Sequence, residues 1–250
     1  MKKILGWIFT PFHALFFILI ILIFHVLQII ALRLLGYHAH KKVVDAMEIC
    51  MILNLQIVMG LRLRCNPLPK ELSTDKPLII ISNHQSMFDI PIIGWVFRKY
   101  HPKYISKREL AHGIPSISYN IRHGGSIAIN RGDAAEAVQL IADFGKYLEK
   151  NNFAGCIFPE GTRSRNGVLK PFKTTGTIQL LNATPNAQIL PLVISGSWET
   201  MRYNSLPTPY GIKITLTPLP LINRKNKTSE EIAAECEQAI KQEIEKNKNT

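Results

Sequence analysis

The feature that most constrains this 250-residue chain is a long apolar segment near its N-terminus. Residues 4–32 include no charged side chain, and from Ala14 onward the segment is almost wholly apolar apart from His25 and Gln28. A helix needs about 20 such residues to cross the hydrocarbon region of a bilayer. A signal peptide would normally have a shorter apolar stretch of about 7–15 residues that ends at a small-residue cleavage site, whereas this one runs into Arg33. We therefore expect a retained membrane anchor.

A second helical stretch is expected over roughly Val43–Leu63, because its few polar side chains recur at helical spacing among apolar ones. Basic residues flank the first apolar segment on both sides, so the positive-inside rule does not decide its orientation. The sequence leaves open whether the two helices span the membrane or dip into one leaflet.

The formal net charge is +12, and its distribution matters more than its total. Residues 1–66 contain seven basic and two acidic side chains, residues 67–224 contain eighteen and ten, and the tail from Lys225 contains five and six. Nucleic acid and anionic lipid both favour such a surface, and the apolar N-terminus favours lipid. Without a Cys-x-x-Cys pair, neither a zinc site nor a disulfide framework is indicated by the four cysteines, Cys50, Cys65, Cys156 and Cys236.

From Pro67 onward, short apolar runs alternate with longer amphipathic ones. Capping residues predict one helix from Asp133 to about Lys150 and a last one beginning near Thr228. This alternation predicts an α/β fold with a mixed, largely parallel sheet flanked by helices. The expected strands, too short for helices, are Leu78–Ser82, Tyr104–Ser106, Ser126–Ile129, Gly155–Phe158, Ile189–Ile194 and Ile212–Leu216.

The residues with the most suggestive chemistry follow these strands. His84 and Asp89 come directly after the first strand, a spacing that allows an imidazole to act as a general base while the carboxylate fixes its tautomer. The pattern is weak alone, since a surface or structural histidine fits it too. Arg131 and the segment Pro159–Ser164 follow two further strands, and in parallel sheets ligands collect beyond the carboxyl ends of the strands. We expect these loops to form one site.

Four ordered segments together resemble the blocks of the glycerolipid acyltransferases, most closely the bacterial lysophosphatidic acid acyltransferases of that family. They are Asn83-His84-x4-Asp89, Gly125–Arg131, Phe158-Pro159-Glu160-Gly161-Thr162-Arg163-Ser164 and Ile189–Val193. The resemblance covers roughly residues 75–220 and is carried mainly by the third block. It implies transfer of a fatty acyl group from a coenzyme A or acyl-carrier-protein thioester to a glycerolipid hydroxyl, without another cofactor. It also implies residues 1–66 as a two-helix membrane anchor and residues 67–250 as the catalytic domain.

Carried over by position, His84 would deprotonate the hydroxyl of the acceptor, and Asp89 would hold the other ring nitrogen. Arg131 and Arg163 would hold the acceptor phosphate, for which paired guanidinium hydrogen bonds are suited. The residues that the resemblance implies for substrate binding are Lys107, Arg131, Glu160, Gly161, Thr162 and Arg163.

Two departures from the family pattern leave the acceptor open. Ala128 and Asn130 stand where a bulky apolar residue and an aspartate are common, and Gly176 lies one residue later than usual. The leading hypothesis is a membrane-bound enzyme that makes phosphatidic acid from lysophosphatidic acid. Alternatives are another acceptor, such as a lyso-ornithine lipid, or a non-catalytic lipid-binding protein.

A metal-dependent hydrolase is a further alternative, and it is disfavoured because no further His or carboxylate lies near His84 and Asp89 at ligand spacing. We expect no metal and no nucleic acid, but the lipid bilayer, lysophosphatidic acid and a thioester donor as partners. Because both donors are cytosolic, the expected location is the cytoplasmic face of a bacterial inner membrane. The sequence determines neither the acyl-chain length nor the choice between the two donors.

Overall fold

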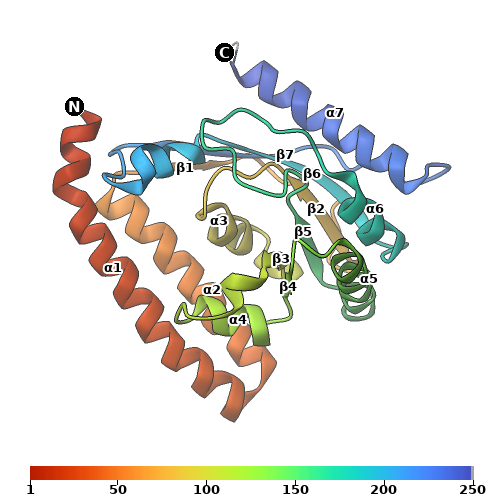
Figure 1. Cartoon of the computed structure of the whole chain (residues 1–250), viewed down its shortest axis with the longest axis horizontal. Coiled ribbons are helices and arrows are strands. Elements are labelled where there is room, and N and C mark those ends of the chain that lie inside the picture. Colours follow the sequence, from red (N-terminus) through yellow and green to blue (C-terminus); the bar gives the residue numbers. More distant parts are fainter. Residues whose placement is uncertain (249–250) are drawn as a thin grey trace.

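A computed structural model of the chain describes residues 1–248, which form seven strands and seven α-helices (Figure 1). The strands are β1 (Arg62–Cys65), β2 (Leu78–Ser82), β3 (Lys103–Lys107), β4 (Ile127–Ile129), β5 (Ala154–Ile157), β6 (Gln188–Ser195) and β7 (Lys213–Pro218). The helices are α1 (Lys2–Ile30), α2 (Tyr37–Leu53), α3 (Asp89–Val96), α4 (Ile117–His123), α5 (Ala134–Asn151), α6 (Thr174–Asn182) and α7 (Ser229–Lys248).

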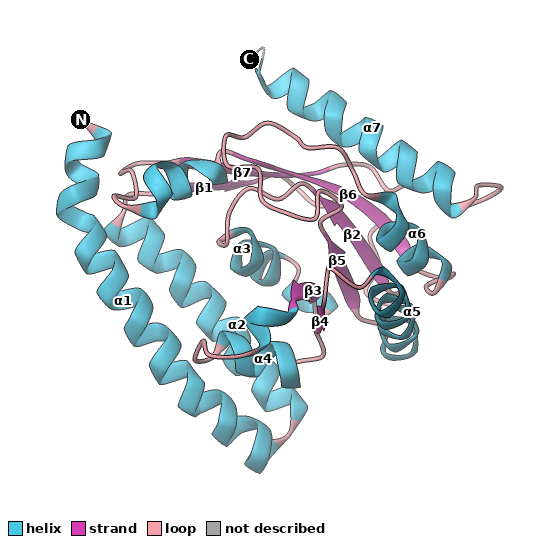
Figure 2. Cartoon of the chain, viewed as in Figure 1, coloured by secondary structure: helices cyan, strands magenta, loops and turns pink. Residues whose placement is uncertain are grey.

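The strands form a single sheet in the order β1-β7-β6-β2-β5-β3-β4. All neighbouring pairs are parallel except β6 and β7, which are antiparallel. The predicted mixed, largely parallel sheet flanked by helices is therefore confirmed (Figure 2). Each of the six expected strands is present, with ends that differ by a few residues.

Strand β2 lies in the middle of the sheet and is buried on both faces. Leu78 and Ile80 contact one hydrophobic cluster, whereas Ile79 and Ile81 contact the other, and all four are 0% exposed. Full burial of an aliphatic side chain of this size contributes about 1.5–3 kcal/mol. The run of four large apolar residues thus anchors the strand whose end carries the candidate base.

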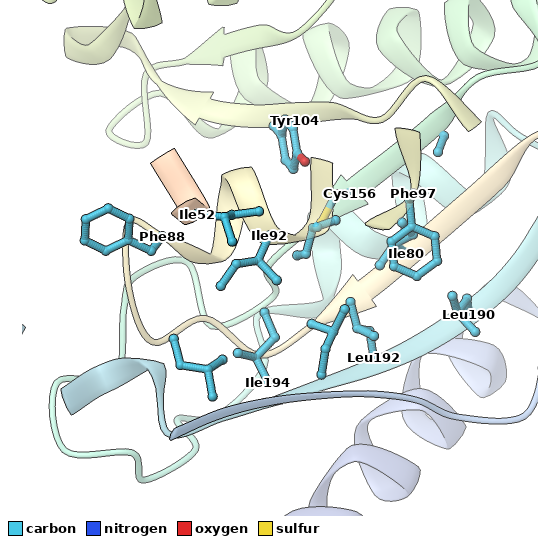
Figure 3. Close-up of a cluster of buried hydrophobic side chains, with 14 of the residues drawn as sticks. Ile52, Ile80, Phe88, Ile92, Phe97, Tyr104, Cys156, Leu190, Leu192 and Ile194 are labelled. Carbon is cyan, nitrogen blue, oxygen red and sulfur yellow. The ribbon is translucent and has the colours of Figure 1, made fainter. Parts of the chain in front are cut away.

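The two clusters are covered by different helices (Figure 1). On one face, Ile52 of α2 and Ile92 of α3 pack against β2 and β6 residues such as Leu192 (Figure 3). On the other face lie α5, α6 and α7, which contribute Phe144, Leu180 and Ile240 respectively. This sandwich holds the carboxyl ends of the parallel strands in fixed positions along one edge.

The prediction that the second helix extends to about Leu63 is wrong. α2 and the π-helical turn that follows it stop at Val58, and the next residues form strand β1 instead. Gly60 turns the chain with a φ of +63°, and a Cβ there would lie 2.6 Å from the Tyr210 ring, so only glycine fits. Pairing with β7 then overrides the local helical pattern, and Arg62–Cys65 adds a strand to the edge of the sheet.

Helix α1 continues through a π-helical turn to Leu35, and Lys2–Leu35 is the one helix among the described residues long and apolar enough to cross a membrane. It packs along α2 on one side of the molecule (Figure 1). Its inward face carries polar groups that meet the body: the Thr10 hydroxyl donates to the Thr208 carbonyl and the Gln28 amide donates to the Ser116 hydroxyl. Its outward face is a row of exposed apolar side chains that includes Trp7, Phe12, Phe16, Ile23 and Ile30.

Candidate active site

The candidate base stands on a turn fixed to the sheet at both ends. After β2, the Asn83 amide donates to the Ile194 carbonyl and accepts from the Ile194 N–H, both at 2.8 Å, so it imitates a strand pairing with β6. Five residues beyond His84, helix α3 begins at Asp89. The strand end and the helix start therefore hold the turn from opposite sides.

The two side chains of the expected pair meet. His84 Nδ1 lies 2.8 Å from Asp89 Oδ2, and the aspartate is 0% exposed. The same oxygen accepts hydrogen bonds from the backbone N–H groups of Gln85 at 2.7 Å and Ser86 at 2.8 Å. Three polar contacts therefore hold this buried carboxylate oxygen in place. Since Nδ1 faces the aspartate, Nε2 is the ring nitrogen that can take a substrate proton.

The imidazole is positioned by stacking as well as by hydrogen bonding. Its ring lies over the Phe158 ring with centroids 4.2 Å apart and planes inclined by 20°. The His84 side chain keeps 17% of its surface exposed. A base that is held on one face and open elsewhere is able to receive a hydroxyl group of another molecule.

The Ser197 hydroxyl is a part of the site that the sequence did not indicate. Fully buried, it donates to the second carboxylate oxygen, Asp89 Oδ1, at 2.6 Å. The Ser197 carbonyl accepts from the Thr200 hydroxyl at 2.7 Å, and that hydroxyl lies 2.6 Å from the Ser86 hydroxyl. The segment after β6 thereby fixes the aspartate. Only its place after a strand could have suggested it, because serines in loops are common.

Glu160 connects two loops of the site. Its side chain is 2% exposed; Oε1 accepts from the His84 N–H at 2.7 Å, and Oε2 accepts from the Lys170 N–H at 2.9 Å. Burial raises the pKa of this carboxyl, while the two N–H donors act in the opposite direction. In addition, the Ser164 N–H donates to the His84 carbonyl at 2.8 Å. These contacts are those of a brace between the loops, and a direct role of Glu160 in substrate binding stays a prediction.

Arg131 contacts the loop that is held by Glu160, whereas Arg163 belongs to this loop and extends to the segment after β6. The Arg131 guanidinium donates to the Gly161 carbonyl, and Arg163 Nη1 lies 3.1 Å from the Met201 sulfur. Gly161 has a φ of +67°, a conformation that favours glycine at this tight turn. Thr162, between the glycine and Arg163, is exposed. The predicted cationic loop thus lies beside the turn that carries the base.

Two lysines lie near this loop, one expected and one missed. Lys107 is exposed at the end of β3, where its register partner Ile129 precedes Arg131 by two residues. The missed one is Lys173, whose backbone N–H donates to the Pro159 carbonyl at 2.9 Å. A Cβ on Gly161 would lie 3.9 Å from the Lys173 ammonium. No local sequence pattern marks Lys173 as a site residue, because only the tertiary fold brings the segment before α6 back to the loop at Gly161.

Chemically, the site combines a base, an aligned carboxylate and a set of cations. Among residues 1–248, no group of three or more His, Cys, Asp or Glu side chains is placed to hold a metal ion. The arrangement can remove a proton from a hydroxyl while positive charge holds an anionic group nearby.

The sequence places this fold and site in a known class. The model of the acyltransferase family matches residues 67–195, so the chain belongs to the acyltransferase family. Human 1-acyl-sn-glycerol-3-phosphate acyltransferase beta is 35% identical over 127 residues, which cover 51% of this chain and 44% of the human protein. The 1-acyl-sn-glycerol-3-phosphate acyltransferase of Escherichia coli K12 is 26% identical over 187 residues, covering 75% and 74%.

The similarity has a different extent in sequence and in structure. The chain spans about half the length of several curated relatives that it matches, including the human protein. In structure, it is similar over its whole length to the crystal structure of the 1-acyl-sn-glycerophosphate (LPA) acyltransferase PlsC from Thermotoga maritima. The TM-score is 0.76 at 20% identity, with 100% of this chain and 99% of the other covered. This likeness identifies the fold, including an N-terminal region that the family match leaves out.

Proposed function

We propose that the protein transfers a fatty acyl group from an acyl thioester to the sn-2 hydroxyl of 1-acyl-sn-glycerol-3-phosphate, which gives phosphatidic acid. The observation that carries the proposal is the 2.8 Å contact between His84 Nδ1 and the buried Asp89, beside a loop with two arginines. Membership of the acyltransferase family and the similarity to 1-acyl-sn-glycerol-3-phosphate acyltransferases support the same reaction.

In the proposed reaction, His84 Nε2 takes the proton of the acceptor hydroxyl while the oxygen attacks the thioester carbonyl. Asp89 stabilises the imidazolium that forms. The carbon–sulfur bond then breaks, and the imidazolium returns its proton to the leaving thiolate. The products are an ester and a free thiol, and the base ends in its starting state. A single histidine base contributes about 10²–10⁴-fold, so positioning of the two substrates supplies much of the remainder.

Arg131 and Arg163 would hold the phosphate of the acceptor. Both lie on or against the Gly161–Ser164 loop, which is hydrogen-bonded to the backbone of His84. A guanidinium group binds a phosphate through two parallel hydrogen bonds, which fixes orientation as well as distance. Lys107 and Lys173 would add positive charge. The acceptor hydroxyl would then be presented to the base from a fixed anchor.

The membrane element supports a lipid acceptor, and its contacts favour insertion into one leaflet. The carbonyl of Lys2 accepts from the Tyr210 N–H at one end of α1, while Gln28 contacts Ser116 near the other. The helix between them is about 39 Å long at 1.5 Å per residue, more than the roughly 30 Å hydrocarbon core. A helix that touches the globular body at both ends cannot cross the bilayer while the body stays in water. We infer that its apolar outer face inserts from the side of the catalytic domain.

The location follows from the substrates. Coenzyme A and acyl-carrier-protein thioesters are cytosolic, so the catalytic domain would lie on the cytoplasmic face of a bacterial inner membrane. The expected partners are the bilayer, lysophosphatidic acid and one of these thioesters, with no metal or nucleic acid.

The decisive experiment compares wild type with His84→Ala in a strain that lacks lysophosphatidic acid acylation and in an assay with labelled acyl thioester. We expect complementation by wild type only, while both proteins remain in the membrane fraction. If His84→Ala restores growth and transfer, the enzymatic proposal is wrong and a lipid-binding role is favoured. Transfer to a lyso-ornithine lipid in preference to lysophosphatidic acid would keep the mechanism and replace the acceptor.

A further inference from the structure

A cavity of about 280 Å³ adjoins Gln85, the residue that follows the candidate base. It is bounded by the turn after β2, the loop 166–168, the end of β6 with the segment that follows it, and the C-terminal end of α7. Among the residues that line it are Gln85, Asn166, Val168, Ser195, Trp198 and Asn247.

The cavity lies between the segment after β6 and the continuation of the arginine loop. Ser195 at the end of β6 lines it, and so does loop 166–168, which follows Arg163 in the loop after β5. The two segments are in close contact, since a Cβ on Gly167 would lie 2.6 Å from Trp198 Nε1. Gln85, the residue after His84, also forms part of the cavity wall. A reaction with two substrates needs two positions around one base, and the cavity offers a second position beyond the arginines.

The chemistry of the cavity differs from that of the arginine loop. None of the residues that line it within the described part of the chain is charged. Three of them carry side-chain amides, Gln85, Asn166 and Asn247, and Ser195 adds a hydroxyl. Trp198 provides an aromatic surface. A phosphate would be poorly neutralised here, whereas a ligand with its own amides and short apolar segments would find donors, acceptors and packing surfaces.

We propose that this cavity binds the phosphopantetheine arm of the thioester donor, an inference that rests on the proposed acyltransferase function. The arm is slender, and alternates amides with methylene and methyl groups. It is shared by coenzyme A and acyl carrier protein, and it carries the thioester at its end. The volume of about 280 Å³ lies at the lower limit of ligand pockets and fits an arm better than an entire coenzyme.

Basic side chains at the rim would meet the phosphate end of the arm. The Arg202 guanidinium lies 4.9 Å from the centre of the Trp198 ring and 3.9 Å from the Glu199 carboxylate, which offsets part of its charge. Lys213 is exposed and lies next to Gly196, which also lines the cavity. A Cβ on Gly196 would lie 2.2 Å from the Lys213 carbonyl oxygen. An anionic group that leaves the uncharged cavity would therefore find positive charge at its mouth.

The test fills the cavity from two directions. Val168 is 52% exposed and Asn247 is exposed on α7, so tryptophan at either position should be accommodated by the fold. For Val168→Trp and for Asn247→Trp, we expect the KM for the thioester to rise at least tenfold, with the KM for lysophosphatidic acid within twofold. The control, Thr74→Trp, adds the same bulk at the opposite edge of the sheet, where Thr74 is exposed, and should match wild type.

A second pair of variants tests the rim by charge. Lys213→Glu is expected to raise the KM for the thioester severalfold and to reduce its dependence on salt. Lys76→Glu makes the same charge change before β2, at the far edge of the sheet, and should have no such effect. If both variants change the KM for the thioester equally, the cause is the net charge of the protein, and the proposed rim is wrong.

Direct binding separates this proposal from the proposed function. Calorimetry in detergent micelles measures binding of coenzyme A and of holo acyl carrier protein to wild type and Val168→Trp, without acceptor or turnover. At least tenfold weaker binding of either ligand to the variant supports the site and identifies the carrier. If the variant binds both ligands as wild type does, or if its KM for lysophosphatidic acid rises instead, the donor assignment is overturned. If wild type binds the donor but does not acylate lysophosphatidic acid, only the proposed acceptor is wrong and the donor site stands.

Discussion

Ser197 donates a hydrogen bond of 2.6 Å to Asp89 Oδ1, so that both oxygens of this buried carboxylate are occupied before any substrate arrives. The serine belongs to the segment after β6, whereas the aspartate begins α3. The orientation of the base therefore depends on a contact between parts of the chain 108 residues apart.

Removal of that hydroxyl should lower catalysis more than substrate binding. Hydrogen bonds to charged groups contribute about 1.5–3 kcal/mol, so for Ser197→Ala we expect kcat to fall by roughly 10–100-fold with both KM values within about threefold. Ser197→Thr retains the hydroxyl and should recover part of the loss. Steady-state kinetics with both substrates varied would check this. An unchanged kcat in Ser197→Ala would show that Asp89 is held adequately by the backbone donors.

The arginines should act on the acceptor phosphate. Replacement of Arg131 or Arg163 by glutamine removes a charged donor pair, and we expect the KM for lysophosphatidic acid to rise about tenfold or more. The KM for the thioester should stay within about twofold. Monoacylglycerol, which lacks the phosphate, is the control acceptor, and its slow turnover should be the same in wild type and variants. An equal loss with monoacylglycerol would mean that the arginines support the loop rather than the phosphate.

The lowered pKa of the buried Lys103 should make the stability of the protein depend on pH. Lys103 is the first residue of β3 and is 5% exposed. Burial and the nearby Lys41 lower its pKa to about 8, while Glu48 and Asp45 act in the opposite direction. The unfolded chain keeps the ordinary value of 10.5, so between pH 8 and 10.5 it binds more protons than the folded protein does. The free energy of unfolding contributed by this lysine should thus rise across that window, by ~3 kcal/mol.

The measurement compares wild type with Lys103→Met in detergent micelles. Methionine keeps much of the side-chain volume without the charge, so the difference between the two proteins isolates the lysine. Relative to the variant, wild type should gain thermal stability from pH 8 to pH 10.5 and change little between pH 6 and pH 7.5. A constant difference over the whole range would contradict a depressed pKa.

The outer face of α1 should determine membrane attachment. Trp7 and Phe12 are 53% and 54% exposed, and a charge within a bilayer costs about 2.5–3.5 kcal/mol. The double variant Trp7→Glu with Phe12→Glu should therefore lose most of its sedimentation with lipid vesicles and retain activity on acceptor dispersed in detergent. The control places the same two charges at Gln238 and Gln242, which are exposed on α7. Comparable release of both variants would rule out a specific role for α1.

Local patterns were sufficient for much of the fold. The four consecutive apolar residues at 78–81 predicted a buried strand, and the polar residues that follow predicted a functional turn. The cap formed by Asp133 likewise marked the start of α5, where its carboxylate accepts from the Glu136 N–H. Each of these signals depends on residues a few positions apart, and for that reason could be read directly.

What failed or was missed depends on distant contacts. The helix expected to reach Leu63 gives way to β1 because β7, about 150 residues later, offers a strand partner. Ser197 and Lys173 carry no distinctive pattern, and they join the site only because the sheet and α6 return their segments to it. Neither the register of β1 nor these positions can be inferred from neighbours in the sequence.

The sequence by itself determined an apolar N-terminal helix, an α/β body and a His84–Asp89 turn followed by an arginine-bearing loop, because periodicity, caps and residue spacing act over short distances. Only the tertiary structure decided that α1 lies along the globular body, that Ser197 holds the aspartate, and that an uncharged cavity forms between loop 166–168 and the segment after β6. Those relationships arise from strand order and helix packing, which bring together side chains that no local pattern connects.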